Sequence, residues 1–241
     1  MLRTRLSERL QDVLLDSDVL EDFLRQLSVL AAEFVAAETD RPVMCSVRLA
    51  RRRKPTVLAG SSREALILDN LQDGVAEGPG VEARKTGLAV LVPDTTMDPR
   101  WRRYQRAAAQ RGYRSILTVA VLAERDATAV LTFSSPSPEA FDDGAVAACG
   151  ALAVRAARAM RLAVRLDSAK SLHRDLLQAM RSRTEINLAT GILMAQSRCS
   201  QSEAFELLAR VSNTRNVKLR VIAEDILRRF DDGPAGAALS A

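Results

Sequence analysis

The sequence predicts an α+β fold, in which an antiparallel sheet flanked by helices is followed by a long helix and a small three-helix unit. Three observations carry this prediction. Short β-compatible runs alternate with helical segments between residues 44 and 135. From residue 159 to 180, mostly apolar side chains recur at alternating steps of three and four. Beyond residue 181, two further amphipathic segments follow, and the first opens with a capping box.

The first 143 residues alternate short helices with short strands. Helical periodicity covers residues 6–38, with a break at 16–18, where acidic or hydroxyl side chains should cap the second helix. The runs expected to form strands are residues 44–50, 55–60, 88–94, 115–123 and 127–135. The remaining segments are helices at 65–71 and 101–111, the latter ended by Gly112, and turns or loops at 51–54, 77–83, 124–126 and 135–141.

The chain is helical from about residue 141 and carries a coiled-coil seam of about three heptads. Its members are Ala159, Leu162, Leu166, Ala169, His173, Leu176 and Met180. A lone helix would leave this stripe in water, so we expect a homodimer through the same helix of a second chain. The alternative is packing against the chain's own N-terminal helix, and both can hold in a four-helix arrangement. His173, the only histidine, would fix the register of the seam.

Two short helices complete the chain. Ser200 and Glu203 form the capping box of the first, whose apolar stripe is Ala204, Phe205, Leu208 and Val211. Asn216 is expected to cap the last helix, whose apolar side chains are Leu219, Ile222, Ala223, Ile226 and Phe230. These segments divide the chain into a sheet domain at 1–143, a linker helix at 144–180, a three-helix domain at 181–230 and a disordered tail at 231–241.

Composition and charge limit the class of protein and the kind of partner that it can have. The 241 residues are 47% hydrophobic and 27% charged, as in a globular protein with a core. No apolar run reaches the roughly 18–20 residues of a membrane span, and the N-terminus resembles no targeting peptide, so we expect a cytoplasmic protein. Residues 1–143 have a net charge of −1, whereas residues 144–230 carry 15 Lys/Arg and 7 Asp/Glu, a net charge of +8. This asymmetry indicates a polyanion partner or, alternatively, a solvated surface that favours arginine.

An enzyme is not expected. The single histidine lies on the seam, where it cannot serve a serine or cysteine nucleophile. Cys45, Cys149 and Cys199 are far apart and fit no metal or redox motif, and the chain has no phosphate-binding loop. We therefore assign no catalytic residue and no metal ligand.

The three-helix unit resembles the ANTAR domain, an RNA-binding module of bacterial antitermination regulators. The matching residues are Ile186, Ala189, Gly191, Ile192, Leu193, Met194, Ala204, Phe205, Leu208, Ser212, Asn216, Leu219 and Ala223. The family often has lysine where this chain has Thr190, which removes one phosphate contact. The resemblance implies a dimer that binds paired stem-loops in nascent mRNA and so prevents a competing terminator hairpin from forming.

The body resembles a GAF domain, the fold of small-molecule sensors, over about 120 residues. The resemblance lies in the segments 65–94, 98–104, 111–121 and 129–141, taken in order. Gly80 stands where relatives often have cysteine, so thiol chemistry is lost there. Together the two parts resemble a GAF–ANTAR antitermination regulator of the actinobacterial type. No cofactor is implied, although the sensor domain would respond to a small molecule of unidentified class or to a protein.

Small residues in the middle of a helix mark the expected RNA surface. Thr190, Gly191 and Met194 lie within little more than one turn and would leave a flat surface for an unstacked base. Close packing is the alternative, with Gly191 admitting the last helix and Met194 filling the gap. The other expected RNA contacts are Arg183, Arg198, Ser212, Asn213, Arg215, Asn216, Lys218 and Arg220.

Two rival hypotheses remain. Three short helices after a dimerising stalk can resemble a helix-turn-helix, so the chain could be a DNA-binding regulator with a sensor domain. The mixture of Glu224 and Asp225 with arginines on the last helix argues against insertion into a groove. In the third hypothesis, the C-terminal unit binds a protein and the chain is a sensor or scaffold.

Overall fold

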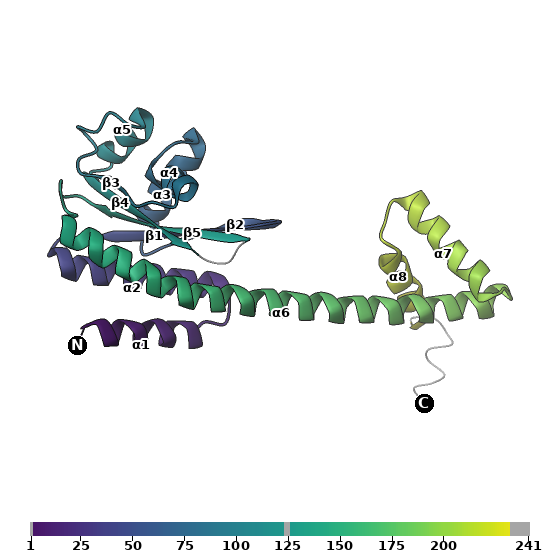
Figure 1. Ribbon diagram of the computed structural model, residues 1–241. Coiled ribbons are helices and arrows are strands. Elements are labelled where there is room, and N and C mark those ends of the chain that lie inside the picture. Colours follow the sequence, from purple (N-terminus) through teal and green to yellow (C-terminus); the bar gives the residue numbers. More distant parts are fainter. Residues whose placement is uncertain (1, 123–125, 232–241) are drawn as a thin grey trace. The chain divides into compact units, whose positions relative to one another are not determined.

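The computed structural model describes residues 2–122 and 126–231, which form two compact units (Figure 1). The first unit spans Met1–Asp167 and the second spans Ser168–Ala241. Within the described ranges, no helix is long and apolar enough to cross a membrane. Glu124 and Arg125 of the expected turn, and residues 232–241 of the expected tail, lie outside these ranges.

A five-stranded antiparallel sheet forms the centre of the first unit, as predicted. Its strands are β1 (Met44–Arg51), β2 (Lys54–Gly60), β3 (Val90–Val92), β4 (Ser115–Leu122) and β5 (Ala127–Ser135). They lie in the order β2-β1-β5-β4-β3. The long central strand β5 pairs with β1, where Met44 lies opposite Ser134, and with β4, where Ser115 lies opposite Ser135.

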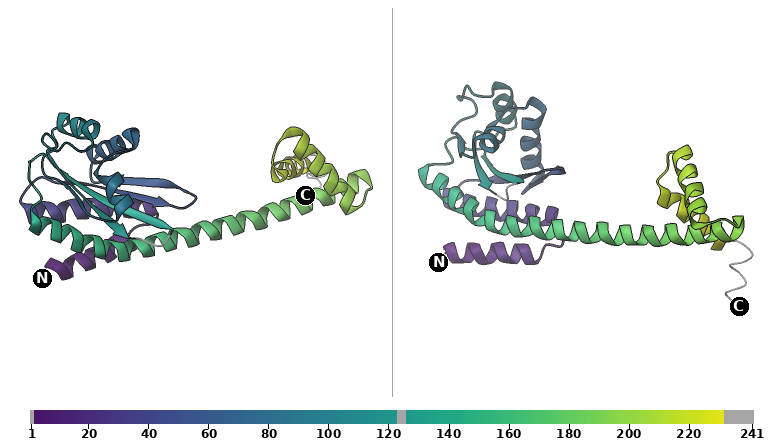
Figure 2. Two further views of the ribbon diagram at one scale, coloured as in Figure 1. Left: turned by 45° about the horizontal axis from the view of Figure 1, so that its top comes forward. Right: turned by 45° about the vertical axis from the view of Figure 1, so that its right-hand side comes forward.

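Helices cover both faces of this sheet (Figures 1 and 2). On one face lie α2 (Leu20–Thr39) and the first part of α6 (Asp143–Ser197), and α1 (Leu2–Leu15) packs against α2 on the side away from the sheet. On the other face lie α3 (Arg63–Val75), α4 (Pro79–Thr86) and α5 (Arg102–Gln110). Alternate residues of a strand point to opposite faces. Cys45, Val47 and Leu49 therefore enter the core under α2 and α6, whereas Met44 joins the core under α3 and α5.

A buried ion pair ties the sheet to α3. Arg48 of β1 donates from Nε to Oδ2 of Asp69 at 2.6 Å, and Ser46 Oγ donates to the other carboxylate oxygen at 3.2 Å. The side chains of Arg48 and Asp69 are only 8% and 1% exposed. Each of these buried charges would strongly lower the stability of the fold without the other, so the two residues must remain paired.

Three local predictions are wrong in the first unit. Residues 77–83, expected as a loop, enter helix α4, where Pro79 occupies the first turn and so loses no hydrogen bond. The N-cap of α2 is Val19 rather than an acidic or hydroxyl residue of the break, and the Ser17 hydroxyl instead donates to the Val13 carbonyl of α1. Strand β3 is shorter than the expected 88–94.

The second unit consists of the end of α6, α7 (Gln201–Arg215) and α8 (Leu219–Asp231). Its core is the cluster of Ala189, Leu208, Ile222 and Ala223, against which Ile186, Leu193 and Leu219 pack. The capping box is confirmed: Ser200 N donates to Glu203 Oε2 at 2.8 Å, and Glu203 N donates to Ser200 Oγ at 3.3 Å. Phe205, Val211 and Phe230 were expected in apolar stripes but are 46, 38 and 38% exposed.

Two corrections concern the ends of the last helices. Asn216 was expected to cap α8 but ends α7 in the left-handed conformation, with φ 51° and ψ 42°. Asparagine adopts this conformation more readily than most residues, so it suits a helix C-terminus. Asp231, assigned to the tail, is the last residue of α8.

The stripe on α6 is exposed over much of its length. Leu166, Leu176 and Met180 are 47, 57 and 61% exposed in the single chain. Nearer the sheet, α6 has a neighbour in α1, because Leu10 and Leu14 line one groove with Ala159 and Leu162. Of these seam residues, Ala159 packs against the core of the first unit, whereas Leu162 lines the groove but is 48% exposed. The alternative of packing on the N-terminal helix therefore applies to the start of the seam only.

We predict that Asp69→Asn lowers the free energy of unfolding by about 3–5 kcal/mol, because it leaves the Arg48 charge buried without its anion. Urea unfolding of the full chain measures the loss. The matched control is Arg9→Ala, which breaks an exposed pair with Glu33 and should cost at most about 1 kcal/mol. A loss below about 1 kcal/mol for Asp69→Asn would show that the pair is dispensable.

Candidate nucleic-acid interface

The turn between α7 and α8 presents the first group of expected RNA contacts. Ser212 closes this turn, since its hydroxyl donates to the Val217 carbonyl at 2.6 Å and its own carbonyl accepts from Val217 N at 3.0 Å. Asn213, Arg215, Asn216 and Lys218 are consequently held exposed on a short, well-bonded segment. The Ser212 hydroxyl, an expected RNA contact, uses its proton to hold the turn and keeps its capacity to accept a hydrogen bond.

The surface of α6 presents the second group. Gly191 is exposed, and a Cβ atom built on it would meet no atom of the described residues within 4 Å. Met194 is half-buried and lies outside the three-helix core. Thr190 departs from the expectation: it is 4% exposed, and its hydroxyl donates to the Ile186 carbonyl at 2.7 Å. Thr190 is therefore part of the interior and offers no surface to a base.

The position of Gly191 decides between the two explanations of the small residues. If glycine were needed so that α8 could approach, an added Cβ would meet α8, and it meets nothing. Glycine inside a helix costs roughly 0.5–1 kcal/mol relative to alanine. Packing among the described residues therefore does not require glycine at position 191.

The expected contacts do not form one patch. Arg198 adopts a left-handed conformation, with φ 50°, in the turn between α6 and α7. Arg215 lies at the other end of α7, whose 15 residues span about 22 Å at 1.5 Å per residue. One group thus comprises Gly191, Met194 and Arg198, and the other comprises the α7–α8 turn. Arg183 is exposed on α6, and Arg220 is half-buried on α8.

A basic hollow between α6 and α8 was missed at the sequence level. It has a volume of about 490 Å³, and Arg174 and Arg181 of α6 line it together with Arg220 of α8. Glu185 and Glu224 also line it, so the arginines exceed the carboxylates by one. Arg174 and Arg181 lie two helical turns apart on one face, which is the signal that could have revealed them.

The polar groups on these surfaces are suited to binding an anionic partner through hydrogen bonds. Guanidinium, ammonium and amide groups donate hydrogen bonds to phosphate and to base edges. No group of three or more His, Cys, Asp or Glu residues in the described ranges could hold a metal ion. The cysteines are free, and burial raises the pKa of Cys149 to about 12, which keeps that thiol protonated at neutral pH.

Family models match both parts of the chain. The model of the GAF domain matches residues 19–160, and the model of the ANTAR domain matches residues 174–227. No curated protein matches the chain significantly.

Solved structures resemble part of the chain in fold alone. A LuxR-family transcription factor from Burkholderia cenocepacia, CepR2, which depends on N-acylhomoserine lactone, is 16% identical with a TM-score of 0.50, covering 68% of this chain and 99% of its own. The GAF domain of an Acinetobacter phosphoenolpyruvate-protein phosphotransferase is 19% identical with a TM-score of 0.49, covering 70% and 98%. A type II free methionine-R-sulfoxide reductase from Thermoplasma acidophilum is 16% identical with a TM-score of 0.44, covering 58% and 94%.

We predict a lowered pKa for Glu203, because the backbone N–H and then the hydroxyl of Ser200 donate to its carboxylate. The capping box consequently stabilises α7 above the ordinary pKa of 4.5 and loses this contribution as the pH falls through the lowered value. Carbon-detected NMR titration of the Glu203 carboxyl group in the full chain measures this pKa. Ser200→Ala removes the hydroxyl and should raise the pKa part of the way back. An ordinary pKa in the unmodified chain would contradict the capping geometry.

Proposed function

This chain belongs to the GAF family and has the GAF–ANTAR architecture, and from that premise we propose that it is a signal-responsive transcription antiterminator. ANTAR domains are RNA-binding antiterminator domains and GAF domains are sensor domains, and neither is typically enzymatic. In the proposed function, two copies of the chain bind a pair of hairpins in nascent mRNA. The bound hairpins prevent a terminator hairpin from forming, and transcription continues.

The observation that carries the proposal is the exposed backbone of α6 at Gly191. A helix surface without a side chain lets a splayed base approach closely, and single-stranded loop bases are what proteins read in RNA. Met194, half-buried beside it, offers an adaptable apolar contact. Packing among the described residues does not require this glycine, so its surface is open to a base.

Cations of the ANTAR domain would hold the phosphates. Phosphate contacts fix the position of an RNA, and contacts to bases give the specificity. The proposed phosphate contacts are Arg174, Arg181, Arg183, Arg198, Arg215, Lys218 and Arg220, with Asn213 and Asn216 hydrogen-bonding to bases or backbone. Thr190 and Ser212 are left out, because their hydroxyls already bond within the unit.

Dimerisation would bury the stripe of α6. Leu166, Leu176 and Met180 are about half exposed in a single chain. Complete burial of a fully exposed large apolar side chain contributes about 1.5–3 kcal/mol, so burial of the exposed half of each would contribute about half as much. Pairing of two α6 helices along this stripe would place two ANTAR domains together. Two hairpins could then be bound by one dimer.

The GAF domain would supply the regulation. A signal changes RNA binding only if it binds two states of the protein with different affinities. The proposed states differ in the pairing of α6 or in the placing of the ANTAR domains.

A DNA-binding regulator is the alternative, and α8 argues against it. A recognition helix must present base-reading side chains to a major groove. In α8, Ile222 and Ala223 are buried, and Arg229 Nη2 forms an ion pair with Asp225 Oδ2 at 2.9 Å. Competition between a hairpin RNA and duplex DNA for the chain separates the two functions.

We predict that Gly191→Ala weakens binding of a two-hairpin RNA about tenfold, because an added methyl group in a close contact costs about 1–3 kcal/mol. Electrophoretic shift at low salt measures the affinity. Gly150→Ala is the matched control, since Gly150 also lies in α6 and an added Cβ there meets no atom within 4 Å. Both variants should melt at or above the temperature of the unmodified chain. Equal RNA binding by both would remove Gly191 from the interface.

We predict that Lys218→Glu and Arg181→Glu each weaken RNA binding and reduce the slope of log affinity against log salt by about one, as loss of a phosphate contact does. Arg103→Glu, an exposed charge reversal on α5 of the GAF domain, should change neither. Filter binding over a salt series measures both quantities. Unchanged slopes in both ANTAR variants would mean that these cations do not contact phosphate.

A further inference from the structure

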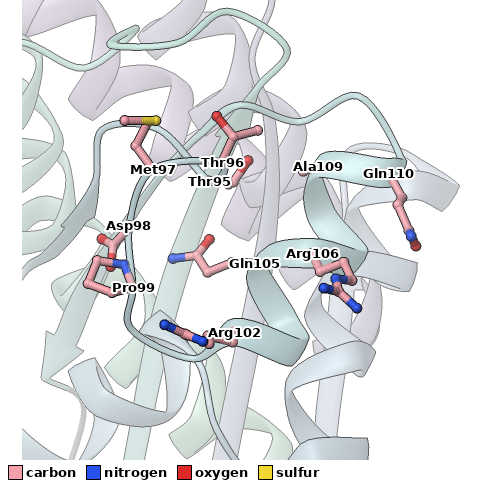
Figure 3. A pocket seen from close by; sticks show the side chains of 10 residues that line it. All are labelled: Thr95, Thr96, Met97, Asp98, Pro99, Arg102, Gln105, Arg106, Ala109 and Gln110. Carbon is pink, nitrogen blue, oxygen red and sulfur yellow. The ribbon is translucent and has the colours of Figure 1, made fainter.

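A pocket in the GAF domain lies between the segment Thr95–Pro99, which follows β3, and helix α5 (Figure 3). Its volume of about 680 Å³ falls within the range of small-molecule sites. It is distinct from the core between the sheet and α5, which is filled by the fully buried Tyr104 together with Leu68 and Val92. The next residue along α5, Gln105, lines the pocket instead.

Gln105 is the unusual feature of this pocket. Its side chain projects from α5 toward the Thr95–Pro99 segment (Figure 3). The residue is 2% exposed, and neither its amide nitrogen nor its amide oxygen has a hydrogen-bond partner among the described residues. A buried polar group left without a partner costs about 1–3 kcal/mol. Both a donor and an acceptor are thus held ready in the interior at a cost in stability.

The polar groups of the facing segment are already bonded. Thr95 Oγ1 donates to the Tyr113 carbonyl at 2.8 Å, and Asp98 accepts from the Arg100 guanidinium at 2.5–3.1 Å. Neither group therefore compensates Gln105 or adds an unpaired negative charge to the pocket. This leaves the Gln105 amide as the group that a ligand would satisfy.

Two arginines of α5 line the pocket. Arg102 and Arg106 lie one helical turn apart on α5, both are exposed, and neither forms an ion pair within residues 2–122 and 126–231. The amide atoms of Gln105 are shielded from solvent, so a ligand must displace side chains at the opening to reach them. Met97, which is 80% exposed, and Arg102 also line the pocket.

We propose that this pocket binds a small carboxylate that also carries an amide or ureido group. The carboxylate would pair with Arg102 and Arg106, since guanidinium groups match the geometry of a carboxylate. The amide or ureido group would accept a hydrogen bond from the Gln105 amide nitrogen and donate one to its amide oxygen, which both lack a partner. This inference rests on the proposed sensor function and names the class of ligand that the GAF domain takes.

The test uses the full chain without RNA and three probes: N-carbamoyl-β-alanine, N-acetylglycine and L-glutamine. The side-chain NH₂ signals of Gln105 are followed by NMR in ¹⁵N-labelled protein and identified by their loss in Gln105→Met. Fluorescence of Trp101, the only tryptophan, which precedes α5, gives the affinity. Butyrate, which lacks the amide, and acetamide, which lacks the carboxylate, are the matched control compounds.

At least one probe should shift the Gln105 signals, and both control compounds should bind at least about tenfold more weakly. Gln105→Met should weaken binding of the probe about tenfold. It should keep or raise the melting temperature of the protein, because it removes unsatisfied polar atoms without changing the shape of the side chain much. Arg102→Ala with Arg106→Ala should weaken it similarly, whereas Arg103→Ala should not. This arginine comparison decides the outcome if Gln105→Met fails to fold.

The proposal is overturned if no probe shifts the Gln105 signals at millimolar concentration. It is also overturned if Gln105→Met and the double arginine variant bind the probe as tightly as the unmodified chain. Since RNA takes no part in the assay, loss of RNA binding with intact probe binding would reject the antiterminator and leave the pocket standing.

Discussion

The burial of helix α6 is the constraint on which the rest of the structure depends, because this one helix supplies side chains to two hydrophobic cores. Leu152, Ala156 and Met160 are fully buried in the core of the first unit, and Ala189 is fully buried in the three-helix core. Small residues on the first part of α6 let it pack closely. Between these stretches the helix keeps an apolar stripe that neither core covers, and the proposed dimer follows from that stripe.

Both proposed binding surfaces coincide with residues that lower the stability of the folded chain. Gly191 weakens a helix without easing any contact, and Gln105 holds a polar group in the interior without a partner. Natural sequences break local rules of stability chiefly at functional positions. Arg48 and Asp69 show the contrast, since their buried charges are paired and need no external group.

The period of apolar residues was sufficient to predict the sheet, its flanking helices and the long helix, because burial of one face dictates that period. It did not predict the start of α4, where Pro79 and Gly80 suggested a loop and a bond from Gly80 N to Gln72 Oε1 at 2.6 Å favours the helix. Asn216 suits either helix end by composition, and only its backbone angles assign it to α7. The roles of Thr190 and Gln105 depend on which side of a helix meets a neighbour, which a single sequence does not specify.

The mass of the complex between the full chain and a two-hairpin RNA tests the central claim most directly. Sedimentation equilibrium gives this mass independently of shape. The account predicts two chains of 26.3 kDa on each RNA at low salt. A complex that contains one chain, or a folded chain that sediments without RNA, would contradict it.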